Sequence, residues 1–119
     1  MPAYASPQSG GLRQVGPGEF LTLFDGTEAN AAMASIAFAR GPSAGQSEAP
    51  TTFYASGVVA ETITVQASNT NVDADYATIG TLVNNDSPAN GNQFFTDTGV
   101  PAFYRVHKSG GVAVVKVQR

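Results

Sequence analysis

The sequence contains no cysteine and no tryptophan, and it has few charged residues. Without cysteine, neither disulfide bonds nor thiolate metal sites are available, so packing alone must hold the fold together. Charged residues make up 13% of the chain, whereas about a quarter is usual. A surface built mainly from small and uncharged polar residues is poorly protected against association. We therefore expect partners to cover much of it.

Basic residues are scarce: six Lys and Arg stand against nine Asp and Glu, which gives a net charge of −3. Nucleic-acid binding needs clustered Lys and Arg that displace counterions from phosphates, so we expect no direct binding of DNA or RNA. No stretch approaches the roughly 20 apolar residues that cross a bilayer, and the first residues lack the regions of a secretion signal. We expect no membrane association.

What the sequence does contain is a series of short strand patterns between turn residues. A chain of 119 residues favours one core. Polar and apolar residues alternate strictly in residues 61–67, which places Ile63, Val65 and Ala67 on a buried face. Strands at this spacing predict an all-β fold, an antiparallel β-sandwich or jelly roll formed by residues 20–119. The expected strands are residues 19–24, 61–67, 76–83, 94–96, 102–108 and 112–117.

Three of these segments allow finer predictions. Residues 19–24 have large apolar side chains on both faces, so we expect both faces, including Phe20, to be buried. In residues 29–40 alanine favours a helix, but the alternation of apolar positions favours a strand, which we prefer. Ser109-Gly110-Gly111 suits a short reversal, so residues 102–108 and 112–117 are expected to form a hairpin. Tyr104, Val106, Val115 and Val117 would then face inward.

The first 19 residues are dense in proline and glycine, which predicts an extended N-terminal arm. Tyr4, Leu12 and Val15 are the apolar points through which this arm would bind a neighbour. Phe103 and Arg105 should face outward on their strand. There Arg105 would bind a carboxylate, either across an interface or from a nearby acid of the same chain.

The residues suited to chemistry lack the patterns that chemistry requires. His107 is the single histidine, and no nucleophile elbow, zinc pair or phosphate-binding loop accompanies it. Asp73 and Asp75 lie in an Asn- and Asp-rich turn, which explains them better than glycoside hydrolysis or a Ca²⁺ site does. We predict no catalytic residue, no cofactor and no metal. Aromatic platforms for sugars remain an alternative, with these candidates: Tyr54, Tyr76, Phe103 and Tyr104.

Three segments in the second half of the chain, residues 58–119, form a recognisable pattern. They are a strand ending in Gln66-Ala67-Ser68-Asn69, a strand containing Tyr76-Ala77-Thr78-Ile79-Gly80-Thr81, and a last pair containing Phe103-Tyr104-Arg105-Val106 and Val114-Val115-Lys116-Val117. This pattern is similar to that of small β-sandwich structural proteins of tailed-phage particles, and it also resembles discoidin-type jelly rolls. Tyr76 stands where the discoidin pattern usually has Trp, which counts against sugar binding.

The phage resemblance implies a non-enzymatic capsid decoration or cement protein that bridges and stabilises capsomers. Such a protein is assembled in the host cytoplasm and sits on the capsid exterior of the virion. Its partners are the major capsid protein and copies of itself in a homo-oligomer, often a trimer. Two alternatives remain open: another virion component, such as a head–tail connector, tail or fibre protein, and a carbohydrate-binding jelly-roll module.

Overall fold

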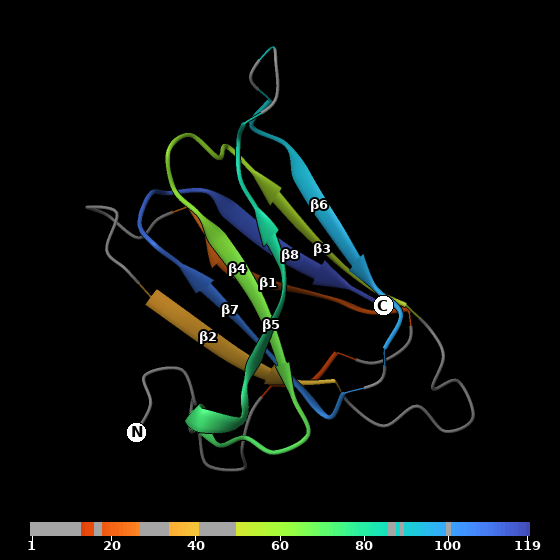
Figure 1. Ribbon diagram of the computed structural model, residues 1–119. Helices are drawn as coiled ribbons and strands as arrows, with labels where there is room; N and C mark the ends of the chain where they lie inside the picture. The colour runs from red at the N-terminus through yellow and green to blue at the C-terminus, as the bar shows by residue number, and fades with distance from the viewer. Residues whose placement is uncertain are drawn as a thin grey trace.

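A computed structural model describes the greater part of the chain as two facing antiparallel sheets (Figure 1). This confirms the predicted all-β sandwich. The described residues are 13–15, 18–26, 34–40, 50–85, 88, 90–99 and 101–119. The elements are β1 (Phe20–Asp25), β2 (Ala34–Ala39), β3 (Thr51–Ser56), β4 (Ile63–Ser68), the short 3₁₀ turn η2 (Asp73–Asp75), β5 (Ala77–Leu82), β6 (Gln93–Asp97), β7 (Phe103–Lys108) and β8 (Val114–Gln118).

Each sheet has four strands, and successive strands often lie in different sheets. The first sheet has the order β1-β8-β3-β6, and the second has the order β2-β7-β4-β5. In Figure 1 the two sheets lie one behind the other, and β6 forms the right-hand margin of the first sheet. Each sheet therefore has one face toward the shared core and one face turned away from it.

The core is centred on three aromatic rings contributed by both sheets. Phe38 and Tyr104 come from the second sheet, Phe53 comes from the first, and all three are fully buried. The Tyr104 ring lies 5.5 Å from that of Phe38 and 5.1 Å from that of Phe53, measured between centroids. Burial raises the pKa of the Tyr104 hydroxyl, and so does Asp97, whose Oδ2 accepts its hydrogen bond at 2.7 Å.

Period-two alternation identified the buried face of several strands. Ile63 and Val65 are fully buried, and Ala67 packs against the core, as predicted. The four inward positions expected on the last two strands are also confirmed, since Tyr104, Val106, Val115 and Val117 have no exposed surface. The described part of residues 29–40 is the strand β2, which agrees with the preference for strand over helix.

The prediction that both faces of the first strand are buried is wrong at Phe20. A bulge between Thr22 and Phe24 places Leu23 and Phe24 in the core together, while Phe20 is 68% exposed. The reason is that Phe20 pairs with Gln118 on the side of the first sheet that faces away from the core. No described segment forms a third layer over that side.

The predicted hairpin of the last two strands is also wrong. β7 pairs with β2 and β4 in the second sheet, whereas β8 pairs with β1 and β3 in the first. Residues 109–113 therefore cross from one sheet to the other. The inward residues of the two strands meet across the core instead of lying side by side. The alternation therefore predicted the buried positions correctly, although the predicted pairing of the two strands was wrong.

Residues that we assigned to the N-terminal arm contribute to the domain. The backbone of Gln14 forms a parallel bridge to Ala39, and Val15 is fully buried in the core. The backbone N–H of Gly18 donates to the carbonyl of Arg119 at 3.0 Å. Residues 1–12 lie outside the described part of the chain.

Candidate functional site

The outer side of the first sheet carries the largest group of exposed aromatic side chains in the described part of the chain. Alternate residues of a strand point to the same side of its sheet, and the strand register arranges the outward ones in two adjacent rows. We call this surface the aromatic face. Its rows are Thr22, Lys116, Tyr54 and Phe94 in one, and Phe20, Gln118, Thr52 and Thr96 in the other.

Three aromatic rings stand in solvent on this face. Phe20 is 68% exposed, Tyr54 is 43% exposed and Phe94 is 70% exposed. The rings of Tyr54 and Phe94 lie side by side, with centroids 6.1 Å apart. β1 and β6 are the outermost strands of the sheet, so Phe20 and Phe94 lie three strand spacings apart across the strands, about 14 Å, and in adjacent rows.

The polar residues of the aromatic face offer little resistance to burial. Thr52 and Thr96 satisfy each other through a hydrogen bond of 2.9 Å between their hydroxyls. Lys116 is the single charged side chain in the two rows. Burying this surface against a partner would remove the three aromatic rings from water, and its main cost would be the desolvation of one ammonium group. The arrangement is suited to contact with another surface.

The residues predicted to bind partners are not brought together by the fold. Tyr4 and Leu12 lie outside the described residues. Val15 is packed inside this chain and is therefore not available on its surface. Phe103 and Arg105 do lie on the outward side of β7, in the second sheet, but Phe103 is half-buried and Arg105 is only 8% exposed.

Arg105 is covered by the loop that connects β4 to β5. Its guanidinium forms a salt bridge with Asp73 and donates from Nε to Gln66 Oε1 at 2.6 Å. The ring of Tyr76 lies 4.2 Å from the guanidinium carbon, at a distance typical of a cation–π contact. The carboxylate that Arg105 binds is thus an acid of the same chain. Of the two partners predicted for Arg105, a carboxylate across an interface or a nearby acid of the same chain, the structure contains the second.

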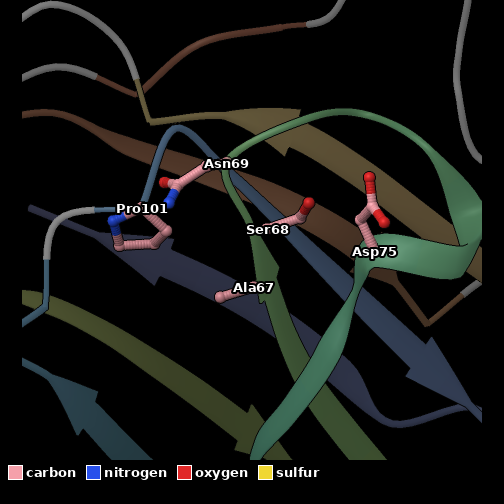
Figure 2. A pocket seen from close by; sticks show the side chains of 5 residues that line it. All are labelled: Ala67, Ser68, Asn69, Asp75 and Pro101. Atoms are coloured by element: carbon pink, nitrogen blue, oxygen red, sulfur yellow. The ribbon is translucent and has the colours of Figure 1, made fainter.

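A hollow of about 430 Å³ lies where this loop leaves β4 (Figure 2). Its polar groups are engaged by other residues of this chain, and Asn69 accepts a hydrogen bond from the N–H of Ala102 at 3.3 Å. Asp75 accepts a hydrogen bond from the Thr70 hydroxyl at 2.7 Å, and Ser68 accepts one from the Thr70 N–H at 3.0 Å. Among the described residues no three acidic, histidine or cysteine side chains gather as metal ligands would. The residues that line the hollow are Ala67, Ser68, Asn69, Asp75 and Pro101.

His107 meets a hydroxyl on the outer side of the second sheet. Its Nδ1 lies 2.7 Å from Ser35 Oγ, and the two residues are cross-strand partners of β2 and β7. Nucleophilic catalysis by a Ser–His pair uses a third group to orient the histidine. Within the described ranges no carboxylate is hydrogen-bonded to His107. The register of β2 against β7 is enough to explain why Ser35 and His107 are in contact.

Glu61 fixes the crossing between the two sheets, a role the sequence did not indicate. The carboxylate accepts hydrogen bonds from the N–H groups of Val59 at 2.8 Å and Ala113 at 3.2 Å. On the same crossing, the buried Lys108 donates from Nζ to the carbonyl of Gly111 at 2.9 Å. Burial acts to raise the pKa of Glu61, but the backbone hydrogen bonds outweigh it and hold the pKa below its ordinary value of 4.5.

This lowered pKa predicts a loss of stability in acid. The folded chain binds the Glu61 proton more weakly than the unfolded chain does, so the stabilisation is complete above the ordinary pKa and is lost as the pH falls through the folded one. Glu61→Gln should lower the free energy of unfolding at pH 7 by about 1–3 kcal/mol. Urea unfolding of both proteins at pH 7 and at strongly acidic pH should show this difference shrinking in acid. A difference independent of pH would contradict this role.

Sequence reasoning missed two of the three aromatic residues on the aromatic face. Tyr54 was among the candidates for stacking, whereas Tyr104, another candidate, is in the core. The missed signal was the pair Phe94-Phe95: in a strand with one buried face, one of two adjacent phenylalanines must point outward. Phe95 packs against the core and Phe94 is exposed.

Neither protein-family models, nor curated proteins, nor solved structures yielded a match to this chain. Within the described ranges, no helix has the length and apolar character needed to cross a membrane. The fold and the aromatic face are therefore the basis for the functional argument.

Proposed function

We propose that this chain is a non-enzymatic structural protein of a phage particle, a capsid decoration protein that binds the outer surface of the shell and stabilises it. The observation that carries the proposal is the aromatic face, with Phe20, Tyr54 and Phe94 exposed around a single lysine. The resemblance of residues 58–119 to phage structural proteins supports the same function.

The aromatic face is better suited to repeated contacts with a shell than to exposure to solvent. Aromatic residues are enriched at protein interfaces, because each ring buries a large area at low cost in conformational entropy. Lys116 adds one positive charge, which favours a partner surface with a carboxylate or carbonyl oxygens opposite it. Weak individual contacts become strong overall when many copies bind one closed shell.

One observation favours the carbohydrate-binding alternative, namely the exposed neighbours Tyr54 and Phe94. Their ring planes, however, are inclined to each other by 38°. A flat sugar chain stacked on both rings would need them closer to coplanar. The aromatic face therefore favours an irregular protein surface over a polysaccharide.

The proposal predicts a major capsid gene beside this one, and it is tested with expanded shells assembled from that capsid protein. The purified chain is expected to sediment with the shells at a fixed copy number per capsomer and to raise their melting temperature. Shells that retain none of the protein at micromolar concentration would contradict the proposal. So would a gene neighbourhood without capsid, portal or capsid-protease genes.

A further inference from the structure

The connection between β5 and β6, at the top of Figure 1, contains an exposed asparagine, Asn90, that is followed directly by Gly91. A side chain on the next residue obstructs attack by its backbone nitrogen on the asparagine Cγ, and glycine has no side chain. Asn90 is thus the asparagine of this sequence that is most open to such an attack. The other asparagines precede residues that have a side chain, namely Ala31, Thr70, Val72, Asn85, Asp86 and Gln93.

Hydrogen bonds fix the backbone and the side-chain oxygen of Asn90. Its N–H donates to Asn84 Oδ1 at 2.8 Å, and its carbonyl accepts from Gln93 Nε2 at 2.9 Å. Its Oδ1 accepts from the N–H of Asn92 at 3.0 Å, two residues along the chain, as Asn side chains do in turns. This bond closes a ring that contains both Asn90 Cγ and the Gly91 nitrogen. The two atoms that would react are therefore held near each other.

The hydrogen bond from Asn92 also favours the attack itself. When a nitrogen adds to the Cγ of an amide, negative charge develops on the amide oxygen, which here is Asn90 Oδ1. A backbone N–H already within hydrogen-bonding distance of that oxygen stabilises the developing charge, as the donors of an oxyanion hole do. The N–H of Asn92 occupies this position.

Packing explains why a residue without a side chain follows Asn90. The Gly91 carbonyl accepts from the N–H of Val58 at 3.1 Å, which ties the connection to the residues after β3. A Cβ added at Gly91 would lie 3.3 Å from the Val58 carbonyl oxygen, a closer contact than side chains usually make. The close approach that favours glycine at position 91 thus keeps Asn90 open to attack.

We propose that Asn90 is a site of spontaneous deamidation in the folded chain. The Gly91 nitrogen loses its proton to hydroxide and bonds to Asn90 Cγ. The bond from Cγ to Nδ2 then breaks, and ammonia leaves with a proton from water, which restores the hydroxide and gives a succinimide. Water opens this ring at Cγ to yield aspartate, or at the backbone carbonyl carbon to yield isoaspartate. Either product adds one negative charge to the net charge of −3.

The two products differ in their effect on the connection. Aspartate keeps a side-chain oxygen as the acceptor for the Asn92 N–H. Isoaspartate lengthens the backbone by one methylene between the Asn90 N–H, bonded to Asn84, and the Gly91 carbonyl, bonded to Val58. These contacts cannot both keep their geometry, so the isoaspartate form should melt at a lower temperature than the aspartate form. Deamidation does not depend on the proposed function, since no shell takes part in it.

The test follows the purified chain at mildly alkaline pH, both folded and unfolded in urea. Peptide mapping by mass spectrometry locates each asparagine that has exchanged its amide for a carboxylate, and enzymatic methylation detects isoaspartate. Asn71, which is also exposed but precedes Val72, is the internal control. In the folded chain Asn90 should react at least roughly tenfold faster than Asn71. It should also react at least as fast as it does in urea, because the fold places the Asn92 N–H on Oδ1.

The variant Asn90→Asp supplies the aspartate product directly. It should elute with the deamidated chain on ion exchange and gain no further mass at position 90. The inference is overturned if Asn90 reacts more slowly in the folded chain than in urea, or if its advantage over Asn71 is smaller than expected. A deamidated chain that contains no isoaspartate also overturns it, because a succinimide opens to both products.

Discussion

Replacing Phe20 and Tyr54 together by serine is expected to weaken binding to expanded shells by roughly a hundredfold. Aromatic side chains that become buried at the centre of an interface often contribute more than about 1 kcal/mol each, and a combined loss of about 2.8 kcal/mol is a factor of a hundred. Both rings lie on the aromatic face, on β1 and β3.

The control for this experiment is another exposed apolar residue outside the aromatic face. Val72 is 55% exposed and lies in the loop before β5, next to the second sheet. Val72→Ser should bind shells as the natural chain does, and both proteins should melt within a few degrees of it. Equal loss of binding in both proteins, or unchanged binding by the Phe20 and Tyr54 variant, would show that another surface contacts the shell.

Replacing Gly111 by alanine is expected to lower the free energy of unfolding by about 3–4 kcal/mol, a loss typical of a residue held in strained backbone with no free space. Gly111 has a φ of +79°, which side chains rarely adopt, and a Cβ there would overlap the carboxylate of Glu61. That carboxylate would have to leave the N–H groups of Val59 and Ala113. The crossing between the sheets would lose its main polar contacts.

A substitution at Gly57 separates the backbone cost of Gly111→Ala from the cost of crowding Glu61. Its φ of +77° is nearly the same, but nothing lies within 4 Å of an added Cβ. Gly57→Ala should therefore show the backbone cost alone, about 1 kcal/mol. Urea unfolding at pH 7 measures both variants. If the two substitutions cost the same, the crowding of Glu61 against Gly111 has no energetic consequence.

Period-two patterns predicted which side of a strand faces the core, because burial of alternate residues is a local property. Ile63 and Val65 on β4 and Tyr104 and Val106 on β7 were assigned correctly for this reason. The pattern does not encode which strands become neighbours. Ser109-Gly110-Gly111 was therefore read as a reversal, although this segment crosses between sheets. The hydrogen bond from Ala113 to Glu61 that holds the crossing joins residues distant in sequence.

The candidate site was harder to predict than the fold. Phe20 was assigned to the core because it is large and apolar, yet the outer side of the first sheet leaves it exposed. Val15 was assigned to an arm because prolines and glycines surround it, yet it fills space in the core. In both cases exposure depends on which segments lie over a residue, and this is decided by tertiary packing. Arg105 is a third example, since the loop carrying Asp73 covers it.

Oxidative footprinting of the chain, free and bound to expanded shells, tests most directly the claim that the aromatic face is the working surface. Hydroxyl radicals label exposed aromatic side chains, and mass spectrometry locates the label. We expect labelling of Phe20, Tyr54 and Phe94 to fall severalfold on the shell, while labelling of Tyr76, which lies between η2 and β5 next to the second sheet, stays the same. Unchanged labelling of all three residues in a chain that has bound the shell would contradict the account.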